Sequence, residues 1–435
     1  MLFGLIKIDG SPRVCKLPSM DENQKSNIRA FLTARRAEQF AFLEKLVRLP
    51  SENPPGECGP VISFLCDRLK AMGLTARQLP DMTSGGVVNG KALTNLVIRH
   101  EFGPGPTIAL IAHGDTAAVG PGWKHDPFSG EIVDGNMYGR GVVATKGVIA
   151  AYVYALLALK ALPVAAAGAI ELVITFDGET GGDLGSRWLL ANRHIMPDVA
   201  IAAGTTHSLI TASTGNLMLE VDIKGRTAPS SLPGSGVDTL EAAARVMLAL
   251  YQQRLELNKQ QSKTAGLGAP SLVITQVDGG AAGHRVADRT VMRIDRRLIP
   301  EEDIETVQRE LIGLIGASVI QVPGAVCKVR RKNLTPPMLP GDHTSAVINT
   351  FQNHASEVLG HRLEIRGTRL DTDARHYANA GIPTVLYGVG SDDPHLARVG
   401  RADEVLALDD LRRSTELLAR VLHDLLADNK TPSEL

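Results

Sequence analysis

Apolar residues recur with two different spacings in the first half of the chain. Positions that repeat with the helical period predict helices, and short uninterrupted apolar runs predict buried strands. The expected helices cover residues 27–49, 59–72, 143–162 and 184–192, and the expected strands cover residues 107–112, 171–176 and 199–203. Strands that alternate with helices in this order indicate an α/β fold with a largely parallel sheet flanked by helices.

The pattern changes after residue 214. The stretch LMLEVDIKG alternates apolar and polar residues as an edge strand does, and SLVITQVDGG and RTVMRIDRRL alternate in a similar way. Between and after these strands we expect helices at 237–255 and 304–315 and a strand at 325–331. Strands and helices in this order predict a compact α+β unit.

The first pattern resumes near the C-terminus, with expected helices at 345–358 and 408–427 and a strand at 384–387. We therefore expect one α/β domain built from residues 21–214 and 333–435, with residues 215–332 inserted into it as an α+β domain. Residues 1–20 are expected to form a loose leader, because the apolar start MLFGLIKIDG lacks the features of a signal peptide.

Composition narrows the classes of partner. The 435 residues carry a formal net charge of −1, so no basic field favours nucleic acid as a partner. No uninterrupted apolar run reaches the roughly 18 residues of a membrane helix, so we expect no membrane partner. The four cysteines are scattered without CxxC spacing, which is typical of reduced thiols in a cytoplasmic protein.

Polar side chains gather where four of the expected strands begin or end. The stretches concerned are HGDT (113–116), FDGETGG (176–182), GTTH (204–207) and DTDARH (371–376). Ligands of open parallel sheets bind outside the carboxyl ends of the strands, so these side chains could share one crevice. His113 and Asp115 could be a metal ligand and the aspartate that orients it, or a purely structural hydrogen bond.

Several of these stretches carry a family resemblance. Residues 108–147, IALIAHGDTAAVGPGWKHDPFSGEIVDGNMYGRGVVATKG, resemble the zinc peptidase and deacylase family of acetylornithine deacetylase, succinyl-diaminopimelate desuccinylase, aminoacylase and glutamate carboxypeptidase. FDGETGG, GRTAPSSLPGSGVDTLEA and TDARHYANAGIPTVLYGVG follow in the family's order. The resemblance extends from about residue 38 and implies a catalytic α/β domain. It also implies that the insertion is a lid through which two copies form a homodimer.

The resemblance places the family's metal ligands on residues that mostly cannot bind metal. His113 matches the first ligand and Asp115 its orienting aspartate. The aspartate that bridges two zinc ions falls on Ala144, and the general base falls on Gly178. Glu179 matches the ligand that follows the base.

Two further ligand positions are also changed. The acid of a GEPT-like turn falls on Gly204 or Thr205, and the last histidine falls on Gly400, although His395 lies nearby in the sequence. Because two zinc ions need a bridging carboxylate and enough N and O ligands, we expect no dinuclear zinc centre. At most one weakly held divalent ion, Zn²⁺ or Mn²⁺, is expected at His113 and Glu179 with help from His207 or His395.

The resemblance also suggests how a substrate is held. The lid histidine that polarises the scissile carbonyl falls on Pro229, and the lid asparagine falls on His284. The arginine that commonly holds a substrate carboxylate is kept as Arg297. We take Arg297 and His284, with Asp373 and Arg375 of the last motif, as the candidate substrate-binding residues.

Three functions remain open. The first is a rebuilt hydrolase that cleaves an amide-type C–N bond of a small anionic substrate resembling an N-acyl amino acid, with Glu179, Asp115 and Asp177 as candidate catalytic residues. The second is a catalytically inactive homologue that binds a ligand or serves as a structural subunit. The third is the hydrolytic removal of an amino group with a single metal ion.

Overall fold

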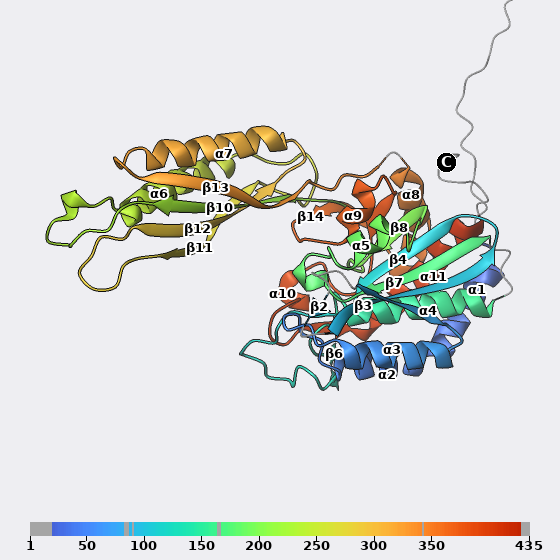
Figure 1. Cartoon of the computed structure of the whole chain (residues 1–435). Helices are drawn as coiled ribbons and strands as arrows, with labels where there is room; N and C mark the ends of the chain where they lie inside the picture. Colours follow the sequence, from blue (N-terminus) through green and yellow to red (C-terminus); the bar gives the residue numbers. More distant parts are fainter. Residues whose placement is uncertain (1–19, 82–86, 89–90, 163–166, 342, 428–435) are drawn as a thin grey trace, which may run out of the picture.

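The computed structural model of the chain describes residues 20–81, 87–88, 91–162, 167–341 and 343–427. The predicted leader lies outside these residues except for its last position. Figure 1 shows a large α/β body and a smaller body, formed by β10 to β13 with α6 and α7, that extends to one side of it. The predicted α/β fold class is therefore confirmed.

The large body is built on a nine-stranded sheet with the order β1-β3-β7-β4-β8-β15-β9-β14, and β2 pairs with β3. The strands are β1 (Ala76–Asp81), β2 (Val87–Val88), β3 (Lys91–Gly103), β4 (Thr107–His113), β7 (Gly168–Thr175), β8 (Val199–Ala202), β9 (Ser208–Ser213), β14 (Glu364–Thr368) and β15 (Thr384–Leu386). A separate small sheet joins β5 (Ile132–Val133), β6 (Asn136–Tyr138) and β16 (Val405–Ala407).

The large sheet is mixed, whereas the sequence predicted a largely parallel one. Strands β7, β4, β8 and β15 are parallel neighbours, but β3 joins β7 and β9 joins β15 in the antiparallel sense. Every residue of β7 and β8 is buried, as expected for strands covered on both faces. The parallel centre places the carboxyl ends of four neighbouring strands at one edge of the sheet.

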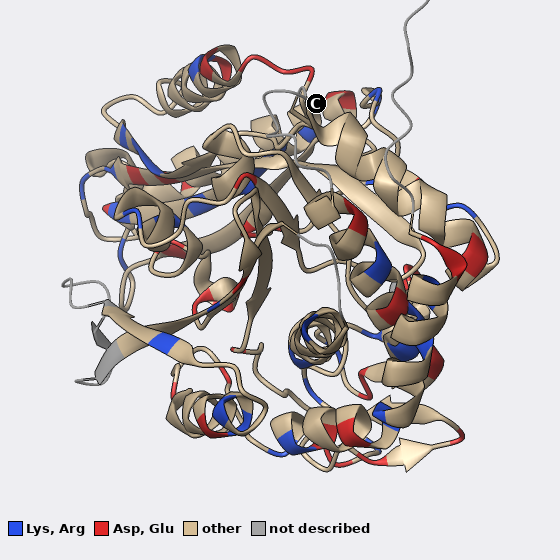
Figure 2. Ribbon diagram, turned by 90° about the vertical axis from the view of Figure 1, so that its right-hand side faces the viewer, with Lys and Arg blue, Asp and Glu red and all other residues tan. Residues whose placement is uncertain are grey.

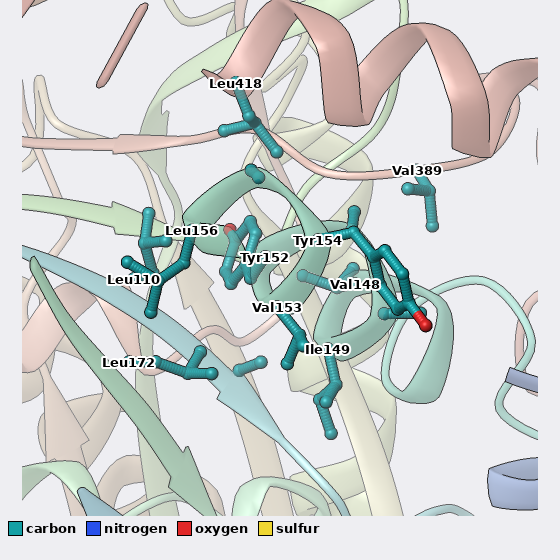
Figure 3. Packing of buried hydrophobic residues seen from close by; sticks show 14 of the residues in the cluster. Leu110, Val148, Ile149, Tyr152, Val153, Tyr154, Leu156, Leu172, Val389 and Leu418 are labelled. Carbon is teal, nitrogen blue, oxygen red and sulfur yellow. The ribbon is translucent and has the colours of Figure 1, made fainter. Parts of the chain in front are cut away.

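Helices cover both faces of this sheet. One face carries α1 (Glu22–Ala34), α2 (Arg36–Val47), α3 (Gly59–Ala71), α4 (Lys146–Ala161), α8 (Thr344–Leu359) and α11 (Leu408–Ala427), and the other carries α5 (Ser186–Ala191) and α9 (Ala374–Asn379). Figure 3 shows α4 between the sheet residues Leu110 and Leu172 and Leu418 of α11. Because α4 is enclosed in this way, it is apolar around almost its whole circumference.

Two predicted helices differ in their bounds. The single helix expected over residues 27–49 is two helices, α1 and α2, which meet at Arg35. The helix expected from residue 143 begins only at Lys146, because residues 140–145 form turns. Among the described residues, no helix has both the length and the apolar character that crossing a bilayer requires.

The smaller body contains a four-stranded sheet with the order β11-β12-β10-β13 and two helices. Its elements are β10 (Gly215–Lys224), α6 (Thr239–Leu257), β11 (Ser271–Gly279), β12 (Arg289–Leu298), α7 (Ile304–Val319) and β13 (Val326–Thr335). Alternate residues of β10, from Leu217 to Ile223, join the core formed with α6 and α7. The prediction of an edge strand here was wrong, because β10 lies between β12 and β13.

The two bodies are joined by continuous strands and by side chains. Strand β13 continues to Thr335, beyond the predicted boundary at residue 332, before the chain returns to the large body.

Figure 2 shows acidic and basic residues interspersed on the helices and loops of the side that it faces.

Candidate active site

A cavity of about 180 Å³ lies at the carboxyl ends of β4, β8 and β15 and beside the turn that follows β7. It brings together His113 and positions 144, 178, 204 and 205, which the family resemblance assigned to metal ligands and the base. Its lining residues are Ile111, Ala112, His113, Val143, Ala144, Gly178, Ala202, Ala203, Gly204, Thr205, Ile210, Thr368, Leu370, Asp371, Thr372, Asp373, Arg375, Leu386 and Val399. The lining is mostly apolar.

His113 ends β4 and is held by Asp115. The Nδ1 atom of His113 lies 3.1 Å from Oδ1 of Asp115. The Asp115 carboxylate is fully buried and also accepts hydrogen bonds from Asn53 Nδ2 and from the backbone N–H groups of Gly178 and Glu179. Three of these contacts hold the Asp115 carboxylate, and the fourth orients the His113 ring through Nδ1. The other ring nitrogen, Nε2, remains for a ligand.

Charge in the site favours the protonated form of the ring. Burial alone would lower the pKa of His113, but the hydrogen bond and negative charge of Asp115 outweigh that effect. With Asp373 and Glu179 nearby, they raise the pKa to about 9. A metal ion would have to displace the ring proton, because only the neutral imidazole binds metal.

Gly178 stands directly against the His113 ring. A Cβ atom built on Gly178 would lie 2.3 Å from Cγ and 2.5 Å from Nδ1 of His113. Real Cβ atoms essentially never approach other atoms so closely, so no side chain fits while His113 keeps this position. The imidazole thus fills the space that the first side-chain atom at this position would need.

The turn after β8 is equally restricted. A Cβ on Gly204 would lie 2.8 Å from the backbone C of Leu386 and from the backbone N of Tyr387. The Thr205 hydroxyl lies 3.0 Å from the hydroxyl of Ser208. At the last ligand position, Gly400, a Cβ would meet nothing within 4 Å, but the backbone φ of +71° favours glycine there.

Ala144 lies in a turn that two buried charged residues hold in place. Arg140 and Glu404 form a buried salt bridge of 2.9 Å, and Glu404 also accepts backbone N–H groups of Gly141 and Val143. Arg140 further donates to the Ala118 and Val119 carbonyls. Sequence reasoning did not predict this pair, although charged residues inside the glycine-rich stretch and in GRADE were a signal for it.

Asp177 and Glu179 have different surroundings. Asp177 is buried, and its Oδ2 accepts the backbone N–H groups of Leu184 and Gly185, which closes the turn after β7. Burial, followed by the negative charge of Asp373, raises the pKa of Asp177 to about 7. Glu179 as a whole residue is exposed, but protein surrounds much of its carboxyl group. This partial desolvation raises the pKa of Glu179, although the His113 charge acts in the opposite direction.

Asp373 and Arg375 of the α9 region line the cavity but bond mainly to the protein. Asp373 accepts from the Ser186 hydroxyl at 3.1 Å, and buried Arg375 donates to the Gly181 carbonyl at 2.5 Å. Arg375 therefore fastens α9 to the turn that contains Gly178. Asp373 and Arg375 are thus the two predicted substrate-binding residues that line the cavity.

Arg297 connects the two bodies. From β12 it donates to both carboxylate oxygens of Asp295, and its Nη1 donates to Asp371 at 2.9 Å. Because Asp371 lines the cavity, Arg297 is connected to the cavity through this carboxylate. A substrate carboxylate would have to share or replace the Asp371 contact.

Besides Asp115, Asp177, Glu179 and Arg297, three more candidates are absent from the cavity lining. His284 is exposed in the smaller body, where the neighbouring Arg285 pairs with Pro229, so the two lid positions are close together. His207 contacts Asp410 at 3.3 Å and His361 at 3.1 Å.

His395 is exposed on α10 (Pro394–Ala397). Neither His207 nor His395 is among the residues that line the cavity with His113. Among the residues that the structure describes, no group of three or more His, Cys, Asp or Glu side chains could hold a metal ion.

Comparison with known proteins identifies the relatives of this fold. Residues 109–424 match the family described as Peptidase family M20/M25/M40. The chain belongs to this family. The resemblance inferred from the motifs is thus confirmed.

Characterised members share moderate identity with this M20-family chain. A succinyl-diaminopimelate desuccinylase from Acidiphilium cryptum is 29% identical over 76% of this chain and 86% of its own. An acetylornithine deacetylase from Edwardsiella ictaluri is 25% identical over 83% of this chain and 90% of its own. These matches support the predicted enzyme class, a hydrolase acting on C–N bonds.

Solved structures extend the likeness in fold. The dipeptidase Dug1p from Saccharomyces cerevisiae has a TM-score of 0.72 at 14% identity and covers 93% of this chain and 99% of its own. An M20 family metallo-carboxypeptidase from Sulfolobus solfataricus has a TM-score of 0.70 at 17% identity, with the same coverage. At these identities the likeness concerns the fold alone.

Proposed function

We propose that this M20-family chain hydrolyses an amide-type C–N bond of a small anionic substrate resembling an N-acyl amino acid, at a site rebuilt without the dinuclear zinc centre. The observation that carries the proposal is the packing of His113 against Gly178. An imidazole held by Asp115 occupies the place of the base. His113 and Gly178 both line the cavity at the carboxyl ends of the parallel strands.

The residues present do not fit a pair of zinc ions. Each zinc ion needs three or four N, O or S ligands, and a pair needs a shared carboxylate. Ala144 supplies no donor, and Gly204 has backbone atoms where a side chain would go. His113 and Glu179 are the donors that remain at the family's positions, so at most one weakly held Zn²⁺ or Mn²⁺ ion is expected.

In this proposal, side chains of the protein itself carry out each step of the hydrolysis. Glu179 would take a proton from water, the hydroxide would add to the acyl carbon, and the same proton would pass to the leaving nitrogen as the C–N bond breaks. The His113–Asp115 pair at the cavity would donate a hydrogen bond from Nε2 to the carbonyl oxygen. Arg297, after exchanging Asp371 for the substrate, would hold a carboxylate through its planar guanidinium.

The smaller body supports a homodimer in this proposal. Its edge strand β11 exposes Val273 and Val277, and α6 exposes Leu248 and Leu255, whose side chains are 61% and 62% accessible. An unpaired edge strand beside apolar side chains favours association with another chain. We infer that a second copy covers these residues.

An inactive ligand-binding or structural subunit is the second candidate. It is favoured by the apolar lining, since Ala144, Gly178 and Gly204 leave few polar groups to stabilise a transition state. Removal of an amino group with a single ion would need the same His113 and Glu179 donors.

Hydrolysis of a panel of N-acyl amino acids separates these candidates. Purified protein would be assayed after chelation and again with added Zn²⁺ or Mn²⁺, beside Glu179→Gln as the base-deficient variant. We expect turnover that survives chelation and is lost in Glu179→Gln. Absence of turnover under every condition would instead favour the ligand-binding subunit.

A further inference from the structure

The cavity at the family's metal-ligand positions has an apolar floor. The floor of the cavity consists of buried apolar side chains from four neighbouring strands, β4, β8, β15 and β9, and the turn before α4. They are Ile111, Ala112, Val143, Ala202, Ile210 and Leu386, each at most 6% accessible. A pair of hydrated or coordinated ions would be poorly stabilised against such a floor.

We propose that this cavity is a binding pocket for an apolar acyl or aryl group of about six carbon atoms. This inference rests on the proposed function, because it places the acyl part of the substrate where the metal pair is absent. The volume agrees: the cavity measures about 180 Å³. In another protein, an apolar cavity of about 150 Å³ stays dry and binds benzene.

The cavity lining contains exposed apolar residues as well as charged residues. Leu370 and Val399 line the cavity and are 70% and 38% accessible. A bound apolar group would cover these exposed side chains at the entrance. The lining also includes the charged residues Asp371, Asp373 and Arg375, which are close together in the sequence just before and within α9. A ligand would thus place its apolar end on the floor and its charged end toward these residues and Arg297.

The floor also selects against a second charge. Arg375 is engaged with the Gly181 carbonyl, and Asp373 is engaged with Ser186. In the proposed reaction Nε2 of His113 already serves the carbonyl oxygen. A carboxylate at the far end of the acyl group would then be buried against apolar side chains with few groups free to pair with it, which is unfavourable. The pocket accordingly favours hexanoyl-like or benzoyl-like groups over succinyl-like groups.

Simple carboxylates test this selectivity without being hydrolysed. Calorimetric titration of the full chain would compare acetate, butyrate and hexanoate with adipate, which has six carbons and a carboxylate at each end. We expect binding to tighten up to about fourfold for each buried methylene. Adipate should bind at least about tenfold more weakly than hexanoate, because its second charge is desolvated.

A matched pair of variants locates the effect. Ala144→Leu places a larger apolar side chain in the cavity lining and should abolish the advantage of hexanoate over acetate. Ala317→Leu adds the same atoms at an exposed position of α7 and should leave that advantage unchanged. If Ala144→Leu does not fold, a crystal of the unaltered chain soaked in hexanoate must show the alkyl chain against Leu386.

The outcomes distinguish this inference from the proposed function. Equal affinity for acetate and hexanoate, or an unaltered preference in Ala144→Leu, would overturn the apolar pocket. If the same sample contained no zinc pair, the proposed rebuilt site would stand. Two zinc ions in the cavity would overturn both.

Discussion

Gly178 stands at the position where the family resemblance places the general base. The sequence reveals that a glycine stands at the base position, but only the structure shows why, because the His113 ring fills the space of its side chain. The His113–Asp115 pair itself could be predicted from its spacing at a strand end. The Arg297–Asp371 contact could not, because those residues are far apart in the chain and come from different bodies.

Gly178→Ala isolates the clash between one methyl group and the imidazole. The added Cβ must displace His113 from Asp115, so we expect a loss of about 1–3 kcal/mol in unfolding free energy, typical of an overpacked site. Urea unfolding measures it. The control is Gly313→Ala in α7, where a Cβ meets nothing within 4 Å and stability should rise slightly. Equal effects from the two changes would reject the packing argument.

Burial of Asp177 makes the free energy of unfolding depend on pH. Its pKa is about 7 in the folded chain against an ordinary value of 3.8, so the unfolded chain releases the proton first as pH rises. Stability attributable to this group therefore falls between about pH 4 and pH 7. Asp177→Asn should keep the acceptor for Leu184 and Gly185 and remove this fall. Urea unfolding at pH 5 and pH 8 tests it, and parallel pH curves for both proteins would contradict it.

At the scale of elements, the alternation of apolar residues predicted strands well but not their neighbours. Strand β10 alternates although it is central, because only one face of its sheet is covered by helices. The break between α1 and α2 at Arg35 was missed, since both helices continue one apolar pattern. The antiparallel edges of the large sheet also depend on partners that periodicity does not specify.

The turn before α4 depends on one buried ion pair. Glu404→Ala removes the partner of Arg140 and the acceptor of two backbone N–H groups, so we expect a loss of about 3–5 kcal/mol in unfolding free energy. Asp183→Ala breaks an exposed pair with Arg187 and should cost less than about 1 kcal/mol. Chemical denaturation compares them. A loss below 1 kcal/mol for Glu404→Ala would show that the pair does not support the turn.

At the scale of the whole molecule, the smaller body extends from the larger one and exposes apolar residues (Figure 1). The change of pattern after residue 214 indicated a separate unit, and its own core of β10 to β13 with α6 and α7 explains why. How two such units associate could not be read from the sequence, because no residue pattern specifies the partner surface.

A double substitution tests the association. Leu248→Glu with Leu255→Glu places two charges on one face of α6 and should convert a dimer into monomers, because burying unpaired carboxylates is unfavourable. Light scattering after size-exclusion chromatography gives the mass. Met196→Glu, at an exposed apolar position of the large body, is the control that should stay dimeric. A double variant that stays dimeric would place the interface elsewhere.

The central claim is that this M20-family site has lost its metal pair, and the metal content of the purified chain tests it most directly. Elemental analysis after equilibration with Zn²⁺ and removal of free ion would be read together with a crystal soaked in Zn²⁺. We predict at most one weakly retained ion per chain, at His113 and Glu179, because Ala144, Gly178 and Gly204 leave too few donors. Two fully occupied zinc ions at the cavity would contradict the account.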